Sequence, residues 1–516
     1  MIDKVDFGSV NKKNTPYSQR RSPQFGNGAG FVVSAIQTLE KNPMTNVAFL
    51  DCTTAICPRT IAETTIGSKQ TDDDGNTTSR KFNWLGGFEA FRRESSGLII
   101  NCLIPGFIVK GVAKLLNRPV MGDFKKSNLT GVWANSDTID VLKRYYDVEL
   151  EKTKDKNKLI KNTLTNIIND ISGVDDKEVK YFRDYTKDID IDSFAQKIAD
   201  GSITSKDKEE FYKNLVNKTG VAENIKLAND DKYFSSSLEH LCSSTVDMLD
   251  GMNKEGIIGE SADKYFTKAK RLVNAKSIGG LGVVLALALS AQPINRWITH
   301  KISGRKGAPI YNDEIERTLT PEQKSELNKK KVGAIGIMWG VTGLSMFLDK
   351  PSLKMFQFKG KFPTMDLARL ISAFTFSSRL AVAEDRSELD ECLFRDVATF
   401  SSFYFLGDYV AKGFATAFEK TSGIALTNKL YETDKKTNIF KKFWNWAKHT
   451  KMKSSEELNS IKDVATRTKA TKLRAWCQVG NILFSMLSLG VFIPHYTRSK
   501  TQKREQRLRE LEAGKQ

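Results

Sequence analysis

The chain has 516 residues, a formal net charge of +19 and a mean hydropathy of −0.39. This hydropathy is too low for a protein made mostly of membrane-spanning helices, but the length allows a membrane bundle joined to a soluble part. The lysines are spread along the chain and are densest beside apolar segments. That pattern predicts contact with anionic lipid headgroups and disfavours nucleic acid as a partner.

Residues 1–30 are polar and basic and are expected to form a flexible arm. They contain no apolar signal region, so we expect this arm to stay in the cytoplasm. Three glycines here invite a phosphate-loop interpretation: Gly26, Gly28 and Gly30. No strand precedes them and no Lys-Ser or Lys-Thr pair follows, so a flexible hinge is the favoured interpretation.

Residues 31–116 are expected to form an N-terminal region with short elements. Phe31–Leu39 could be a first helix, and Val47–Leu50 is strand-like but too short to assign. Pro58 is placed to be the first residue of a helix that runs to Ile66.

Cys52 and Cys57 lie five residues apart, which does not fit a zinc site or a redox pair. A thiol at a helix N-terminus can be reactive, so Cys57 carries that possibility beside the favoured structural role.

Ser95–Val109 is the first run without charge, and Pro105-Gly106 interrupts it. Over residues 95–116 it could span a membrane if its lysines reach the interface. A buried or re-entrant helix fits its length equally well.

Residues 117–276 are charged and rich in helix-favouring residues, which predicts a soluble α-helical subdomain. Ile191, Phe194 and Ile198 share one helical face. Ser205 is the expected cap of a helix that ends at Gly220.

Three longer uncharged runs are typical of membrane-spanning helices: Ser277–Asn295, Val332–Leu348 and Ala475–Thr497. The first two define a membrane helical pair over 277–348. The third begins a C-terminal unit, 475–516, that ends in a basic tail. Trp476 and Tyr496 lie near the ends of the third run, where amphipathic rings favour the headgroup level.

Residues 349–474 mix apolar and charged helical segments. Four charges would be intramembrane if residues 365–417 enter the bilayer: Asp366, Arg369, Arg379 and Asp408. Such charges are costly in lipid and usually face a bundle interior or a water-filled cavity. Outside a bilayer the same residues would be ordinary surface ion pairs.

Six carboxylates crowd the connection between the apolar runs of this region: Glu384, Asp385, Glu388, Asp390, Glu391 and Asp396. A two-metal carboxylate site would need histidines at helical spacing, and none lies near. Arginines are interleaved with the acids, so an ion-paired helical connection is favoured.

A stripe of small residues runs along the second long apolar run: Gly333, Gly336, Gly340 and Gly343. Without side chains two helices can approach closely, so we expect a helix-packing face, for a second copy or another membrane protein.

Basic residues in short loops tend to remain in the cytoplasm. Residues 296–331 hold nine Lys and Arg against five acids, and residues 498–516 hold seven against three. Together with a cytoplasmic N-terminus, these biases predict four spans, with residues 117–276 and 349–474 on the far side.

The sequence thus predicts a mainly α protein with about three to six membrane helices, located in the cell membrane as a multi-pass protein. Its predicted role is structural or interaction-based. Two alternatives stay open: a transporter or membrane-embedded enzyme that uses the charges of 366–412, and a soluble basic protein associated with nucleic acid. No catalytic motif, cofactor site or metal site is apparent.

Overall fold

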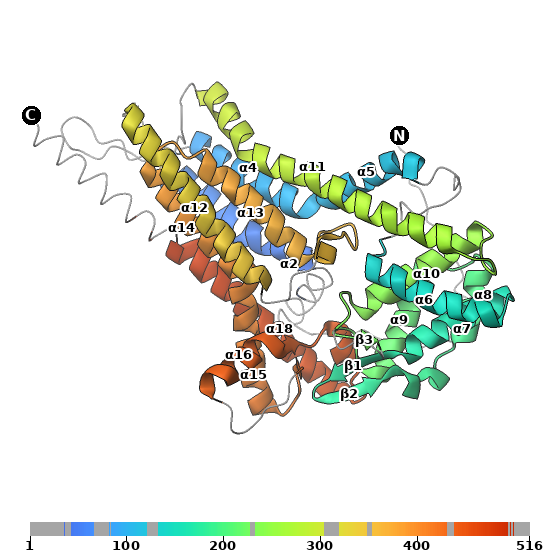
Figure 1. The fold of residues 1–516 in the computed structure, drawn as a ribbon. Coiled ribbons are helices and arrows are strands. Elements are labelled where there is room, and N and C mark those ends of the chain that lie inside the picture. Colours follow the sequence, from blue (N-terminus) through green and yellow to red (C-terminus); the bar gives the residue numbers. More distant parts are fainter. Residues whose placement is uncertain are drawn as a thin grey trace, which may run out of the picture.

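A computed structural model of the chain describes residues 43–66, 84–120, 133–227, 233–303, 319–347, 353–430 and 438–493, and a few single positions. The fold is mainly helical with a few short strands, as predicted. A helical bundle occupies one side, and a smaller subdomain occupies the other (Figure 1). The basic arm, the three N-terminal glycines and most of Phe31–Leu39 lie outside the described residues.

The N-terminal helix is continuous from α2 (Pro43–Leu50) through the π-helical η1 (Asp51–Ile56) into α3 (Cys57–Ile66). The strand-like interpretation of Val47–Leu50 is therefore wrong. Met44, Val47 and Leu50 recur at helical spacing and are all buried, so the run has the single apolar face of a helix. Pro58 does not begin the helix but follows η1 within it.

The next helix, α4 (Trp84–Leu98), continues through the π-helical η2 (Ile99–Leu103) and then breaks. After the break α5 (Pro105–Val120) leaves at 52°. The interruption predicted at Pro105-Gly106 is confirmed. A side chain at Gly106 would collide with the backbone of Lys361, because the ideal Cβ would lie 1.8 Å from its carbonyl oxygen.

The subdomain has one continuous apolar core, which runs from Ala134 to Val273. Its helices and strands are α6 (Ser136–Lys152), α7 (Lys156–Asn169), β1 (Ile171–Asp175), β2 (Glu178–Tyr181), η4 (Phe182–Asp184), η5 (Thr186–Asp188), α8 (Ile191–Ala199), α9 (Ser205–Thr219), β3 (Lys226–Leu227) and α10 (Leu238–Lys254). The three strands form an antiparallel sheet of order β2-β1-β3, which the sequence analysis missed.

The helix signals predicted in this subdomain are largely confirmed. Ile191, Phe194 and Ile198 are all buried on α8. The cap of α9 is Thr204 rather than Ser205, because Thr204 and Asp207 form a reciprocal capping box. Gly220 ends the helix in the left-handed conformation at φ 75°.

The long helix α11 (Asp263–Ser303) starts in the subdomain and runs through the bundle (Figure 1). It packs along α5 and α13. The bundle continues with α12 (Pro321–Phe347), η6 (Leu353–Phe356), α13 (Met365–Ala381), α14 (Arg386–Ser401), the π-helical η7 (Ser402–Leu406) and α15 (Gly407–Ser422).

The C-terminal part consists of β4 (Thr427–Lys429), α16 (Ile439–His449), β5 (Thr450–Met452), α17 (Ser455–Asn459), α18 (Val464–Ser485) and the π-helical η8 (Met486–Phe492). The β4-β5 pair touches the subdomain, since Lys429 N–H donates to the Asp176 carbonyl at 3.0 Å. Lys453 pairs with Asp175 at 2.6 Å. Strands β4 and β5, Lys453 and helix α17 therefore lie against the subdomain.

Two helices are long and apolar enough to cross a membrane: Asp263–Ile302 and Val464–Phe492. The bent pair Trp84–Leu103 and Pro105–Leu116 meets the same criterion when taken together. The described residues therefore contain up to three candidate spans. The run predicted at Val332–Leu348 is not among these candidates in the described residues, because Lys329–Lys331 occupy α12 directly before a short apolar stretch.

Candidate functional site: a polar cavity inside the bundle

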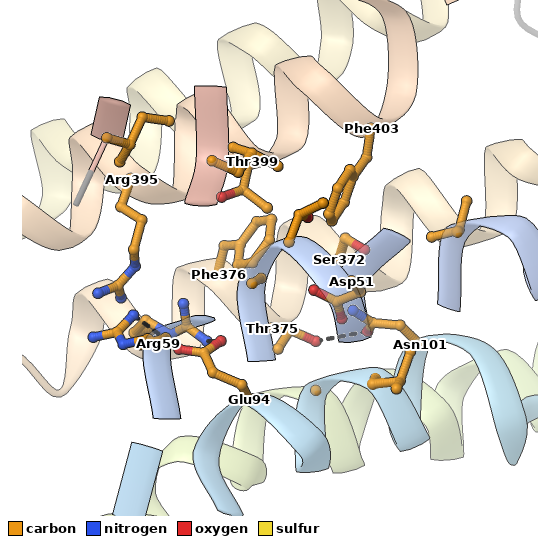
Figure 2. A pocket seen from close by; sticks show the side chains of 18 of the residues that line it. Asp51, Arg59, Glu94, Asn101, Ser372, Thr375, Phe376, Arg395, Thr399 and Phe403 are labelled. Atoms are coloured by element: carbon orange, nitrogen blue, oxygen red, sulfur yellow. Dashed lines mark hydrogen bonds and ion pairs between the residues drawn. The ribbon is translucent and has the colours of Figure 1, made fainter. Parts of the chain in front are cut away.

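A cavity of about 100 Å³ lies between helices that are distant in the sequence. Its walls come from the N-terminal helix, from α4 and η2, from α13, from α14 and η7, and from η8 (Figure 2). Charged side chains gather at one end, where Arg59, Glu94 and Arg395 lie, and a second polar group surrounds Asp51 (Figure 2).

π-Helical segments surround this cavity. Each of the four in the described chain contributes to its wall, with Asp51 on η1, Asn101 on η2, Tyr404 on η7 and Leu489 on η8. π-Helical turns are rare and occur often at functional sites, because the wider turn changes which side chains face inward. Their convergence distinguishes this cavity from an ordinary packing gap.

Glu94 is the centre of the charged end. One of its carboxylate oxygens accepts from Arg59 at 2.9 Å, and the other accepts from Arg379 at 2.9 Å. Arg379 also donates to Asp396 at 2.7 Å, and Arg395 lies 3.3 Å from the same carboxylate. The side chains of Arg379 and Asp396 are only 6% and 1% exposed.

Because this network is buried, the pairing of its charges matters for stability. Removing charges from water costs several kcal/mol per ion, and only close pairing offsets that cost. Because each carboxylate here contacts at least one guanidinium, the network is electrically matched while it stays complete. Loss of a single member would leave a buried charge without its counter-ion.

The other end of the cavity is polar and aromatic. Thr375 donates to the Asn101 side-chain oxygen at 3.0 Å, and Ser372 shares a hydrogen bond of 2.7 Å with the Tyr404 hydroxyl. Phe376 and Phe403 also line the cavity (Figure 2). The wall therefore offers one carboxylate, several hydroxyls and aromatic faces.

Local sequence spacing explains how these side chains converge. Ser372, Thr375 and Arg379 follow one another at helical spacing, so they share the inner face of α13. Glu94 and Asn101 are seven residues apart and share a face of α4 and η2. The sequence analysis identified Arg379 and expected arginines to balance the acids that include Asp396, but it missed Glu94 and the polar stripe at 372, 375 and 379.

The other predicted charges lie away from this cavity. Arg369 pairs with Asp366 at 2.9 Å and donates to the Tyr404 carbonyl at 3.1 Å. Asp408 is exposed and lies 3.6 Å from the buried Lys412. Arg369, Asp408 and Lys412 border a second cavity of about 80 Å³, so the four predicted charges do not form one group.

In the structure, the predicted carboxylate-rich connection forms helix α14, with Asp385 as its N-terminal cap. Glu388 pairs with Arg296, Glu391 lies 3.9 Å from Arg395, and Asp390 lies 3.8 Å from Arg386. Within the described residues no group of His, Cys, Asp and Glu could hold a metal ion. The arginines predicted to balance these acids do contact them.

The predicted glycine stripe faces outward. An added Cβ at Gly333, Gly336 or Gly340 would meet nothing within 4 Å, and the face of α12 that packs in the bundle carries Ala334 and Met338. That the stripe packs against a helix of a second molecule stays a prediction. Cys57 is exposed and Cys52 is half-buried, and neither forms a disulfide.

Two titratable groups lie where the subdomain meets its neighbours. Burial and the nearby Lys359 ammonium lower the pKa of His240 to about 3. Burial raises the pKa of Glu457, which accepts a hydrogen bond from the Ala222 amide at 3.1 Å. The imidazole of His240 is therefore neutral at physiological pH, and the carboxyl group of Glu457 joins α17 to the subdomain by its hydrogen bond.

Fold and cavity together define a class: a mainly helical protein with a polar cavity inside a bundle. Comparison with known proteins adds no family name. No protein-family model, curated protein or solved structure matches the chain.

Proposed function

We propose that the chain is a multi-pass integral protein of the cell membrane whose bundle binds a small molecule in its cavity, as a transporter or membrane-embedded enzyme does. The observation that supports it is the distribution of exposed large apolar side chains. They crowd the outside of the bundle, whereas the subdomain from residue 136 to 276 exposes only Val148, Val179, Tyr181 and Tyr233 among its described residues.

The outward faces of two candidate spans illustrate this distribution. Helix α11 exposes Ile278, Val283, Leu287, Leu289 and Ile294, and the last helix exposes Leu483, Leu487, Val491 and Phe492. Apolar patches of such extent are rare on soluble monomers. In a bilayer they would contact lipid tails, while the buried polar groups would face inward.

Helix α16 supports the same placement. It has no buried residue, and it exposes Ile439, Phe440, Phe443 and Trp444 beside Lys441, Lys442 and Lys448. Aromatic and basic side chains on one short helix suit the headgroup region of an anionic membrane. The Trp446 indole N–H donates to Thr416 at 3.1 Å, which holds α16 against α15.

The cavity favours ligand binding over a purely structural role. Ionisable side chains at membrane depth are costly and usually serve a binding or transport site. The network around Glu94 joins four separate helical segments around an open space instead of filling it.

An interaction role is a second candidate. The exposed glycines of α12 favour it, because they leave a flat strip on which another helix can pack closely. The two roles are compatible, since a bundle with an internal site can also associate through an outer face.

Alkaline carbonate extraction tests the membrane placement. We expect the full chain to remain in the membrane pellet and to enter the supernatant only with detergent. Recovery of most of the chain in the carbonate supernatant would contradict it. The Glu94→Gln variant should behave as the unchanged chain does, since the network lies inside the bundle.

A further inference from the structure

We propose that the cavity binds a small organic ammonium ion and that Asp51 is its counter-ion. This inference names the ligand class of the cavity described above and rests on the proposed binding function, but not on the membrane placement. It follows from the charge balance of the cavity wall, the kind of side chain around Asp51 and the size of the space.

The arginines of the wall are already matched. Arg59 and Arg379 bind Glu94, while Arg395 contacts both Asp396 and Glu391. Next to the wall, Arg93 lies 3.7 Å from Glu94, and the buried Glu89 precedes Arg93 by one helical turn. No positive charge in this group lacks a carboxylate nearby.

Asp51 is the exception among the acids. Within the described residues its carboxylate has no ion pair or hydrogen bond, although it lines the cavity. Figure 2 shows it away from Arg59 and Arg395, beside Ser372 and Thr375. Asp51 is half-buried in the bundle, where a carboxylate without a partner is costly, and a bound cation would offset that cost.

The surroundings of Asp51 suit an organic cation better than a metal ion. Phe376, Phe403 and Tyr404 line the same cavity with aromatic rings. Aromatic rings attract ammonium groups through their negative faces, by about 0.5–2 kcal/mol in water-poor sites. A hard metal ion would need several oxygen ligands, and no cluster of that kind exists among the described residues.

The size of the cavity limits the ligand. A space of about 100 Å³ is smaller than the roughly 150 Å³ cavity that accepts benzene. Primary ammonium ions from methylammonium to propylammonium, which are smaller than benzene, lie within this limit. The arginines of the wall already pair with carboxylates, and an anion would also meet the unpaired Asp51, so acetate should not bind.

The test is calorimetric titration of the purified full-length protein in detergent with the chloride salts of this ammonium series. At least one member should bind, and 1-propanol, the neutral counterpart of propylammonium, should not. Asp51→Asn should weaken ammonium binding by about 30-fold or more, which is the low end for loss of a buried charge partner. Phe403→Leu should weaken it by about fivefold through loss of one aromatic face.

Asp390→Asn is the matched control. Asp390 is 61% exposed, lies on α14 outside the cavity and loses the same charge. Its variant should bind as the unchanged protein does. Thermal unfolding of Asp51→Asn without ligand shows whether the variant is folded.

Three results would overturn the proposal: no ammonium ion binds, 1-propanol or acetate binds as well as the ammonium ion, or folded Asp51→Asn keeps its affinity. Failure of the membrane placement would appear separately in the carbonate extraction, because the titration measures only the cavity.

Discussion

Replacing Arg379 by Met tests whether the buried ion network holds the bundle together. Arg379 is 6% exposed and donates to Glu94 at 2.9 Å and to Asp396 at 2.7 Å. At an effective dielectric constant of about 20, each pair is attracted by roughly 4 kcal/mol. Much of this offsets desolvation, but removing one partner of a buried pair still costs about 3–5 kcal/mol.

We therefore expect Arg379→Met to lower the free energy of unfolding by about 3–5 kcal/mol, measured by SDS titration of the purified protein. Arg386→Met is the control, because Arg386 is 58% exposed and lies 3.8 Å from Asp390. It should change the free energy by less than about 1 kcal/mol. A double variant with Arg379→Met and Asp396→Asn should recover part of the loss, since Glu94 then keeps Arg59 and Glu391 keeps Arg395. Equal effects of Arg379→Met and Arg386→Met would refute the reasoning.

Three further predictions concern other parts of the chain. The pKa of His240 is about 3 in the folded state against 6.5 unfolded. Below pH 6.5 the unfolded chain therefore binds a proton that the folded chain does not, so the free energy of unfolding falls as the pH falls. Between pH 6.5 and 5 the loss is about 2 kcal/mol, and His240→Gln should flatten that part of the measured pH–stability curve. Gly340→Leu should weaken self-association in a membrane two-hybrid assay without preventing insertion, and unchanged association would count against the outer packing face. Because Lys429 and Lys453 contact the subdomain, cysteines at Lys187 and Lys462 should react with an impermeant thiol reagent from the same side of the membrane, and labelling from opposite sides would contradict these contacts.

Helical periodicity and end signals were sufficient to predict much of the fold. The buried faces of α8 and α9, the stop at Gly220 and the break at Pro105 all follow from local rules that tertiary packing did not override. The three-stranded sheet was missed because β1 and β2 are short and their pairing depends on contacts with β3, more than fifty residues away.

The cavity could be predicted only in part. Arg379 was identified because a charge inside an apolar run is conspicuous. Asp51, Arg59 and Glu94 lie at the edges of short apolar segments, and nothing local shows that these segments meet α13. Their role depends on packing between helices that are some 300 residues apart in the chain.

Protection of outward-facing apolar positions by lipid tests the central claim most directly. Val283 and Leu287 on α11 are 45% and 37% exposed, so single cysteines there would react quickly in water. In native membranes, with the six native cysteines replaced by alanine, Val283→Cys and Leu287→Cys should resist a water-soluble maleimide until SDS is added, whereas exposed Lys187→Cys should react once the reagent reaches its side. Rapid labelling of Val283→Cys and Leu287→Cys in intact membranes would contradict a bundle that crosses the bilayer.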